Sequence, residues 1–282
     1  MFDVIIVGSG PAGLSAALNL KLHEKEMIWF GSEEFSEKVQ KSEKIANYPG
    51  EGLVSGAELN VRFLRHAEAM GIAPADKRVT TIMQVGDHFA LLANNEMFEA
   101  RAVLLAAGVA AGKGFSGETE LLGRGVSYCA TCDGFLYKGR TIAVYCGSKR
   151  YEHEAAYLAE LAEKVYLAAG YKDCEIDLPN VERIPAIREV RGNDSVSGIL
   201  LSDGTERTVD GLFCLRNAIS PATLMPGLEM DGPHIVVNRA CETNIPGCFA
   251  AGDCTGRPYQ IAKAVGEGNV AAHAILDYLA AV

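Results

Sequence analysis

The sequence predicts an α/β fold in which parallel strands alternate with helices, and two segments carry this prediction. Residues 2–7 form a β-branched run that stops at glycines, and residues 11–22 then follow an apolar helical period. Residues 141–145 form a second strand of this kind, and a helical pattern follows over residues 152–163. Each segment is typical of the strand, turn and helix that begin a Rossmann-like unit, so we expect two such nucleotide-binding units.

The turn after the first strand has the glycine spacing of a dinucleotide-binding site. Gly8 permits the tight turn, Gly10 lets a pyrophosphate approach the backbone, and Gly13 lets the helix pack closely on the strand. Pro11 suits the first helical turn, whose free N–H groups bind phosphates. An ordinary glycine turn is the alternative interpretation. The candidate cofactor-binding residues of this turn are Gly8, Ser9, Gly10, Pro11, Ala12 and Gly13.

The remaining elements of this unit are simpler to predict. The second strand, residues 27–30, lacks the acidic residue at its end that usually holds a ribose hydroxyl, and Glu33 comes slightly late. Residues 55–71 have the pattern of an amphipathic helix. A strand over residues 103–108 leads towards the nucleotide and ends at Gly108, a further candidate contact. Hairpins are expected over residues 78–94 and, later in the chain, 196–209.

A second half of the same site is expected near the other end of the chain. A short apolar strand ends at Gly252 and Asp253, and a helix follows to about Leu279. An aspartate at a strand end can accept hydrogen bonds from the ribityl hydroxyls of a flavin, and the next helix start can face the ring oxygen. Taken alone, this Ala-Gly-Asp segment would be only a turn. The candidate flavin-binding residues here are Gly252, Asp253, Gln260, Ile261 and Ala262.

Composition and charge exclude several classes of function. The 282 residues carry 26 Lys and Arg against 36 Asp and Glu, a net charge of −10, which argues against a nucleic-acid partner. No window approaches the roughly 18 to 20 uninterrupted apolar residues of a membrane span. The chain enters a strand pattern at Phe2 without a basic-then-apolar leader, so we expect a reducing, cytoplasmic location.

The most informative chemistry lies in a pair of cysteines, Cys129 and Cys132, two of eight in the chain. A zinc site would need a second ligand pair, but the other cysteines form no second C-x-x-C and the histidines lie apart, so no metal is expected. A structural disulfide or two inert thiols are further alternatives. Redox exchange is favoured, because one thiol can resolve a mixed disulfide formed by the other, and Asp133 is close enough to move the proton.

Five motifs, in order along nearly the whole chain, resemble the low-molecular-weight thioredoxin reductase family of flavoproteins. They occupy residues 8–13, 47–50, 125–134, 251–253 and 260–268. The resemblance implies an FAD-binding domain formed by residues 1–112 and 214–282, and a central pyridine-nucleotide-like domain, residues 113–213, that carries the redox cysteines. It also implies a contact from Asn47 to FAD, a homodimer, and oxidised thioredoxin as the substrate. In the matching motif Cys132 faces the flavin, Cys129 attacks thioredoxin, and Asp133 is the general acid.

The central unit departs from the family where NADPH would bind. The family has G-x-G-x-x-A, whereas residues 146–151 read Cys-Gly-Ser-Lys-Arg-Tyr. Cys146 adds a side chain at the tight turn, Ser148 impedes close packing of the helix, and Tyr151 is expected to place a ring near the nucleotide surface. After the next strand, residues 169–172 replace the His-Arg-Arg cluster that neutralises the 2′-phosphate. We therefore expect that NADPH is not used.

The resemblance then narrows to the ferredoxin-dependent flavin thioredoxin reductases, which lack NADPH motifs. Ferredoxin delivers single electrons, which FAD can accept one at a time and pass on as a pair.

Two alternative functions are an NADPH-dependent thioredoxin reductase with a divergent pocket, and a flavin-linked disulfide oxidoreductase with another donor or acceptor, which could hold a second flavin in the central domain. A non-catalytic flavin-binding redox sensor is the third. Candidate cations for docking ferredoxin are Lys113, Arg124, Lys149 and Arg150.

Overall fold

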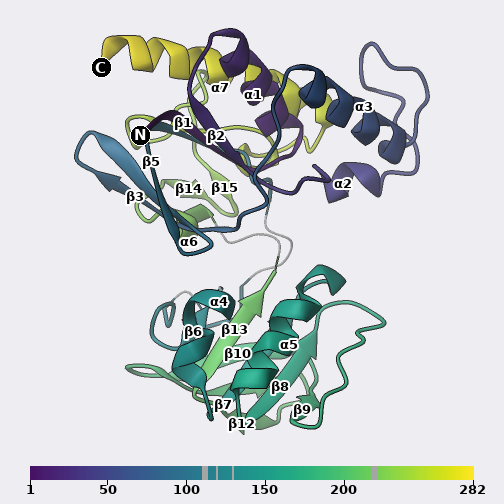
Figure 1. The fold of residues 1–282 in the computed structure, drawn as a ribbon, viewed down its shortest axis with the longest axis vertical. Helices are drawn as coiled ribbons and strands as arrows, with labels where there is room; N and C mark the ends of the chain where they lie inside the picture. Colours follow the sequence, from purple (N-terminus) through teal and green to yellow (C-terminus); the bar gives the residue numbers. More distant parts are fainter. Residues whose placement is uncertain (110–113, 119, 129, 217–220) are drawn as a thin grey trace. The chain divides into compact units, whose positions relative to one another are not determined.

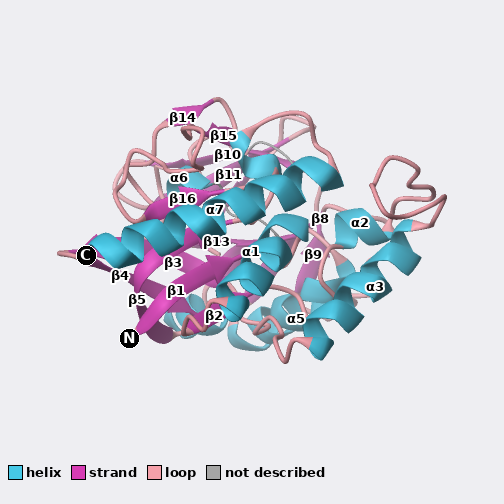
Figure 2. Ribbon diagram, turned by 90° about the horizontal axis from the view of Figure 1, so that it is seen from above, coloured by secondary structure: helices cyan, strands magenta, loops and turns pink. Residues whose placement is uncertain are grey.

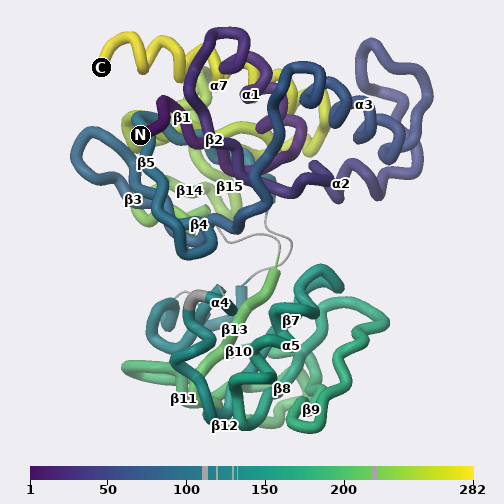
Figure 3. Tube along the Cα trace, in the orientation of Figure 1, coloured from purple at the N-terminus to yellow at the C-terminus, as the bar shows by residue number. Residues whose placement is uncertain are grey.

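The structure is a computed structural model that describes residues 1–109, 114–118, 120–128, 130–216 and 221–282, with the side chain of Cys132 left out. The chain forms two compact units, residues 1–110 with 220–282, and residues 111–219. Figure 3 shows the purple N-terminal and yellow C-terminal segments within the same unit, so the first unit is built from both ends of the chain.

The first unit contains a six-stranded sheet of order β2-β1-β5-β4-β3, in which β16 also pairs with β5; Figure 2 labels these strands. Strands β2, β1, β5 and β16 run parallel, and the meander of β3, β4 and β5 is antiparallel. The expected hairpin over residues 78–94 is confirmed as β3 and β4. The strands are β1 (Phe2–Val7), β2 (Met27–Phe30), β3 (Val79–Val85), β4 (His88–Ala93), β5 (Glu96–Leu105) and β16 (Cys248–Ala250).

Two helices from opposite ends of the chain pack against each other in this unit, α1 (Pro11–Leu22) and α7 (Ile261–Ala281). Figures 1 and 2 show them side by side. The approach is close, because a Cβ at Gly268 would lie 2.2 Å from the carbonyl oxygen of Ala12. Their facing apolar side chains, with Leu20 and Ile275 fully buried, form the main core of the unit.

The smaller elements of the first unit follow local signals. Ser55 and Glu58 form a capping box at the start of α3, which confirms the amphipathic helix predicted there. The other helices and strands of this unit are short. Their bounds are α2 (Glu37–Gln40), α3 (Gly56–Ala69), α6 (Pro221–Leu224), β14 (Met230–Asp231), β15 (His234–Ile235) and η3 (Asp253–Thr255).

The second unit contains a five-stranded parallel sheet of order β6-β13-β7-β8-β9 and a separate antiparallel sheet, β10-β11-β12. The second Rossmann-like frame is thus confirmed, and β11 with β12 forms the hairpin predicted over residues 196–209. The strands are β6 (Val126–Ser127), β7 (Thr141–Cys146), β8 (Lys164–Ala169), β9 (Val181–Arg183), β10 (Ile187–Gly192), β11 (Val196–Leu201), β12 (Glu206–Thr208) and β13 (Gly211–Leu215).

The helical segments of the second unit are α4 (Ala130–Asp133), η1 (Gly134–Tyr137), η2 (Lys149–Tyr151) and α5 (Glu152–Leu161). Cys214, near which we expected the chain to return to the first domain, lies in β13 opposite Tyr145 of β7 and belongs to the second unit. The other expected join, near Gly112, lies outside the described residues. Among the described residues, no helix combines the length and the apolar character that a membrane span needs.

Candidate functional site

The glycine turn between β1 and α1 is shaped by two crowded positions and one open position. A Cβ at Gly8, where φ is +119°, would lie 2.3 Å from the carbonyl oxygen of Ala106, and one at Gly13 would lie 1.9 Å from that of Gly8. These two residues must therefore be glycine for the turn to close. At Gly10 a Cβ would meet nothing within 4 Å. The open face beside Gly10 is where a ligand could approach the backbone.

Two side chains hold this turn in place. The indole of Trp29 in β2 donates a hydrogen bond to the carbonyl oxygen of Gly8 over 2.9 Å. The buried hydroxyl of Ser9 donates to the carbonyl oxygen of Phe35 over 3.1 Å. No motif indicates Trp29, although it is the single tryptophan of the chain and its indole N–H needs a partner when buried.

The predicted residues from the far end of the chain lie in the same unit as this turn. Asp253 follows β16 at a glycine with a φ of +92°, Gly252, and its carboxylate pairs with the ammonium of Lys38. The Asn47 side-chain amide donates to the Gln260 side-chain oxygen over 2.7 Å, although 213 residues separate them. The structure therefore brings together two residues that the sequence motifs named separately. No motif indicated Lys38.

Three further candidates lie at element ends. Gly108 follows β5 with a φ of +71°, and a Cβ there would meet nothing within 4 Å. Ile261 and Ala262 open α7, for which Gln260 is the N-cap residue without a side-chain capping bond. The first turn of a helix leaves its N–H groups unpaired, so the starts of α1 and α7 both offer donors to an anionic or oxygen-rich ligand.

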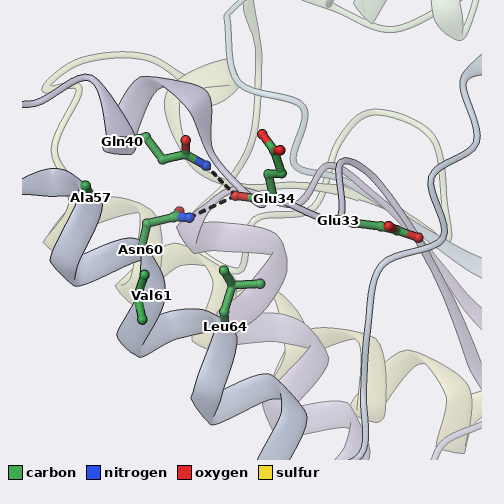
Figure 4. Close-up of a pocket in the computed structure, with 7 residues that line it drawn as sticks. All are labelled: Glu33, Glu34, Gln40, Ala57, Asn60, Val61 and Leu64. Carbon is green, nitrogen blue, oxygen red and sulfur yellow. Dashed lines mark hydrogen bonds between the residues drawn. The ribbon is translucent and has the colours of Figure 1, made fainter. Parts of the chain in front are cut away.

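A cavity of about 310 Å³ opens beyond the end of β2, beside α2 and α3 (Figure 4). The carbonyl oxygen of Glu34 accepts hydrogen bonds from the side-chain amides of Gln40, over 2.6 Å, and Asn60, over 2.8 Å. Glu33 borders this cavity and a second one of about 210 Å³, and Figure 4 shows its carboxylate pointing away from Gln40 and Asn60. The late acidic residue of the sequence thus reaches the protein surface beyond β2.

The redox segment of the second unit, residues 125–134, carries the C-x-x-C motif and is partly described. Cys129 lies outside the described residues, and the backbone of Cys132 belongs to α4. Asp133, the last residue of α4, accepts a hydrogen bond from the Ser127 hydroxyl over 2.6 Å. This bond fixes the predicted proton donor against β6.

The six cysteines outside the C-x-x-C motif are free and buried. Burial raises the pKa of Cys146 and Cys241 to about 11, and that of Cys248 and Cys254 to about 12. A thiol that stays protonated at neutral pH is a poor nucleophile. These four cysteines are therefore unsuited to thiol–disulfide exchange.

The nucleotide turn of the second unit is filled by its own side chains. Cys146 is fully buried at the end of β7, and the hydroxyl oxygen of Ser148 is also buried. Tyr151 was expected near the nucleotide surface, but this expectation is wrong, because its ring packs into the core with Ala155 and Leu158 of α5. Cys146 belongs to the same buried cluster, and its thiol donates to the carbonyl oxygen of Ser148 over 3.4 Å, so it packs beneath the turn, while Tyr151 anchors α5 to the sheet.

Carboxylates surround the ends of β7 and β8, where a 2′-phosphate would need arginines. Glu152 accepts hydrogen bonds from the Tyr171 hydroxyl over 2.5 Å and from the Glu175 N–H over 2.9 Å, and these bonds hold the pKa of Glu152 below its ordinary value. Lys149 pairs with Glu175 over 2.5 Å. The negative charge of Glu152 disfavours a bound phosphate at this place, and the positive charge of Lys149 is already paired with Glu175.

Comparison with known proteins assigns the chain to a family. Residues 2–174 and 180–268 match the pyridine nucleotide-disulphide oxidoreductases. The chain belongs to this family. The thioredoxin reductase of Listeria monocytogenes is 31% identical, and the match covers 99% of this chain and 94% of the relative.

Solved structures give a finer comparison within the family. A ferredoxin-flavin thioredoxin reductase from Clostridium acetobutylicum is 45% identical with a TM-score of 0.94, and the match covers 99% of this chain and 98% of that one. An atypical thioredoxin reductase from Desulfovibrio vulgaris Hildenborough is 32% identical with a TM-score of 0.67, over 100% of this chain and 99% of that one. This member of the family is therefore a flavoprotein disulfide oxidoreductase of the thioredoxin reductase type, and FAD is its cofactor.

The first unit of this oxidoreductase fits FAD. Gly10 leaves the space that a pyrophosphate needs, and the first turn of α1 supplies N–H donors beside it. Asp253 and the bonded pair of Asn47 and Gln260 supply polar groups at the other end of the site. These residues could hold the phosphates and the ribityl chain.

The open space at Gly10 leads to a prediction. In Gly10→Ser, the backbone conformation at the helix N-cap is one that serine adopts well, so the stability of the apoprotein should stay within about 0.5 kcal/mol. The new Cβ and hydroxyl would occupy the ligand space, and we expect the Kd for FAD to rise about tenfold or more, measured by titrating apoprotein with FAD. By contrast, Gly13→Ala should destabilise the apoprotein itself. A wild-type Kd in Gly10→Ser would contradict this placement of the pyrophosphate.

Proposed function

We propose that this enzyme passes electrons from reduced ferredoxin, through FAD and the Cys129–Cys132 dithiol, to oxidised thioredoxin. The observation that carries the donor assignment is the nucleotide turn of the second unit, where the Cys146 side chain and the Ser148 hydroxyl oxygen are buried and which carboxylates border. NADPH needs glycines at this turn and cations for its 2′-phosphate. The similarity to the ferredoxin-flavin thioredoxin reductase of Clostridium acetobutylicum supports the same donor.

In this proposal each unit has one task. The first unit, residues 1–110 with 220–282, binds FAD, with the Gly8–Gly13 turn at the phosphates and Asp253 at the ribityl chain. The central segment carries the dithiol. When bound, FAD supplies the electron pair that reduces the Cys129–Cys132 disulfide to two thiols, with uptake of two protons. A motion of one unit against the other then lets the dithiol alternate between flavin and protein substrate.

The exchange with thioredoxin follows from the chemistry of two neighbouring thiols. Cys129, as thiolate, attacks the thioredoxin disulfide, forms a mixed disulfide and releases one thioredoxin sulfur as a thiolate. Cys132 then attacks the sulfur of Cys129, which frees the second thioredoxin sulfur and restores the Cys129–Cys132 disulfide. Asp133, held by Ser127, protonates a leaving thiolate. In keeping with the family resemblance, Cys132 is the partner that faces the flavin.

An apolar surface for thioredoxin follows the dithiol directly. Phe135 and Leu136, neighbours in η1, are 63% and 56% exposed. Such exposure next to a redox centre suits a transient protein partner.

We further propose that the enzyme is a homodimer and acts in the cytoplasm, in keeping with the family resemblance and with the six free buried cysteines.

The cations considered for ferredoxin docking have different surroundings. Lys149 is held by Glu175, and the Arg124 guanidinium donates to the carbonyl oxygen of Glu120 over 2.5 Å. Lys113 lies outside the described residues. The charge of Arg124 and of Arg150 can be reversed in separate variants. The salt dependence of the rate at which ferredoxin reduces the flavin would then show which of the two cations contributes to ferredoxin docking.

The proposal is tested by anaerobic reduction of the purified yellow protein. Flavin absorbance is followed with excess NADPH, then NADH, then chemically reduced ferredoxin, and thiols are counted on added thioredoxin. We expect bleaching by ferredoxin alone and two new thiols per thioredoxin reduced. Rapid bleaching by NADPH would overturn the donor assignment and make the enzyme an NADPH-dependent thioredoxin reductase.

Two further readouts separate the remaining alternatives. We expect one FAD per chain, because the turn in the second unit is filled, and a second flavin per chain would instead indicate a different electron route through the central domain. Reduction by ferredoxin without thiols on thioredoxin would point to another disulfide acceptor. A protein that binds FAD but turns over no disulfide would be a redox sensor.

A further inference from the structure

Two side chains of α7 hold the turn that carries Asp253. The Lys263 ammonium donates to the carbonyl oxygens of Gly252 and Gly256, over 2.8 Å each, and to the Thr255 hydroxyl over 2.9 Å. An ammonium has three donors, and these bonds use all of them on one segment of five residues. Lys263 therefore ties together both ends of the turn.

Glu267, one helical turn after Lys263, holds the same segment by accepting hydrogen bonds from it. One of its carboxylate oxygens accepts from the Gly252 N–H and from the Thr255 hydroxyl, over 2.8 Å each, and pairs with Lys263 over 3.1 Å. The Lys263 and Glu267 side chains are only 17% and 25% exposed, so water screens these bonds much less than those of a surface pair.

This turn also lies against the phosphate-binding turn. A Cβ at Gly252 would lie 3.0 Å from the Cβ of Ala12, the second residue of α1. The position of the 252–256 turn therefore sets where the Asp253 carboxylate lies relative to the start of α1. Neither Lys263 nor Glu267 is among the residues that the sequence motifs point to as cofactor contacts.

We infer that Lys263 and Glu267 are positioning residues for FAD binding. They hold the 252–256 turn in the position in which Asp253 and the start of α1 bind the cofactor together. The inference rests on the proposed role of Asp253 as a flavin contact. The two side chains touch the turn and not the cofactor. Their loss should thus weaken cofactor binding through geometry while the core between α1 and α7 stays intact.

The test is a titration with FAD of full-length protein from which the cofactor has been removed. Lys263→Met and Glu267→Ala are each expected to raise the Kd for FAD about tenfold or more, since each leaves donors or acceptors of the turn unpaired. Glu267→Gln should recover most of that loss, because its amide oxygen can still accept from the Gly252 N–H. The circular dichroism of the bound flavin should change in Lys263→Met and approach the wild-type spectrum in Glu267→Gln.

Controls separate this role from general stability. Lys77→Met removes an ion pair with Glu96, 2.5 Å long, elsewhere in the same unit, and should bind FAD like the wild type. Apoprotein thermal midpoints are measured for every variant. Loss of FAD affinity only in proportion to a lower midpoint, or wild-type affinity in Lys263→Met and Glu267→Ala, overturns the inference.

One reference variant distinguishes failure of the inference from failure of the site assignment. Asp253→Asn should weaken FAD binding at least as much as Lys263→Met. If Asp253→Asn weakens binding but the α7 variants do not, the positioning role alone is overturned. Wild-type affinity in Asp253→Asn overturns the proposed contact of Asp253 and the inference with it, whichever electron donor the enzyme uses.

Discussion

Replacing Cys132 with serine is expected to leave FAD bound and to lower thioredoxin reduction about 10³-fold or more. A serine oxygen cannot form the internal disulfide, so it can neither receive the electron pair nor resolve a mixed disulfide with thioredoxin. The purified Cys132→Ser protein should stay yellow and should still be bleached by the electron donor. Turnover is measured as thiols formed on thioredoxin with excess reductant.

A second cysteine variant serves as the matched control. Cys174 is buried in the same unit and is free, so Cys174→Ser removes a thiol without touching the C-x-x-C motif. We expect Cys174→Ser to keep most of the turnover. Wild-type activity in Cys132→Ser would overturn the assignment of the dithiol, and equal losses in both variants would indicate a structural effect on the whole unit.

The first unit was largely predictable because its signals are local. The strand, the glycines and Pro11 all lie within residues 2–13, so the motif can be read from one short segment. The supports of the site were not predictable in this way. Trp29 reaches the Gly8 carbonyl, and Lys38 reaches Asp253, only after chain folding brings distant segments together. Neither residue type has a motif that names its partner.

The orientation of Tyr151 shows a different limit. Motif alignment placed it at a nucleotide-facing position, yet Tyr151, Ala155, Leu158 and Ala159 are all buried. Their spacing of four, seven and eight residues from Tyr151 is that of one helix face. Helical periodicity continued back from α5 would have predicted a core tyrosine.

A buried ion pair in the second unit could not be foreseen, because its members lie 98 residues apart. Arg216, just after β13, pairs with Glu118, and the two side chains are 12% and 3% exposed. The Glu118 carboxylate also accepts from the Tyr128 hydroxyl over 2.7 Å and from the Phe115 N–H over 2.8 Å. The guanidinium lies over the rings of Phe115, Tyr145 and Tyr128, at 5.3, 5.8 and 5.9 Å from their centroids. Burial beside Glu118 raises the pKa of Tyr128, which stays a hydrogen-bond donor at neutral pH.

Arg216→Met is expected to destabilise the protein by about 3–5 kcal/mol. The change leaves the Glu118 carboxylate buried with the Tyr128 hydroxyl and the Phe115 N–H as donors among the described residues, and neutral donors offset the cost of burying a charge only in part. Because Tyr128 directly precedes Cys129, the loss should also loosen the start of the redox segment. Denaturant unfolding followed by circular dichroism measures the change in unfolding free energy.

The control is an exposed pair of the same residue types in the same unit. Arg191 pairs with Glu206, and their side chains are 41% and 61% exposed, so Arg191→Met should cost less than about 1 kcal/mol. The double variant Glu118→Leu/Arg216→Met should be more stable than Arg216→Met alone, because it removes the uncompensated charge as well as its partner. Equal, small losses in Arg216→Met and Arg191→Met would show that the buried pair contributes no more than a surface pair. A double variant less stable than Arg216→Met would instead assign the loss to packing against the aromatic rings.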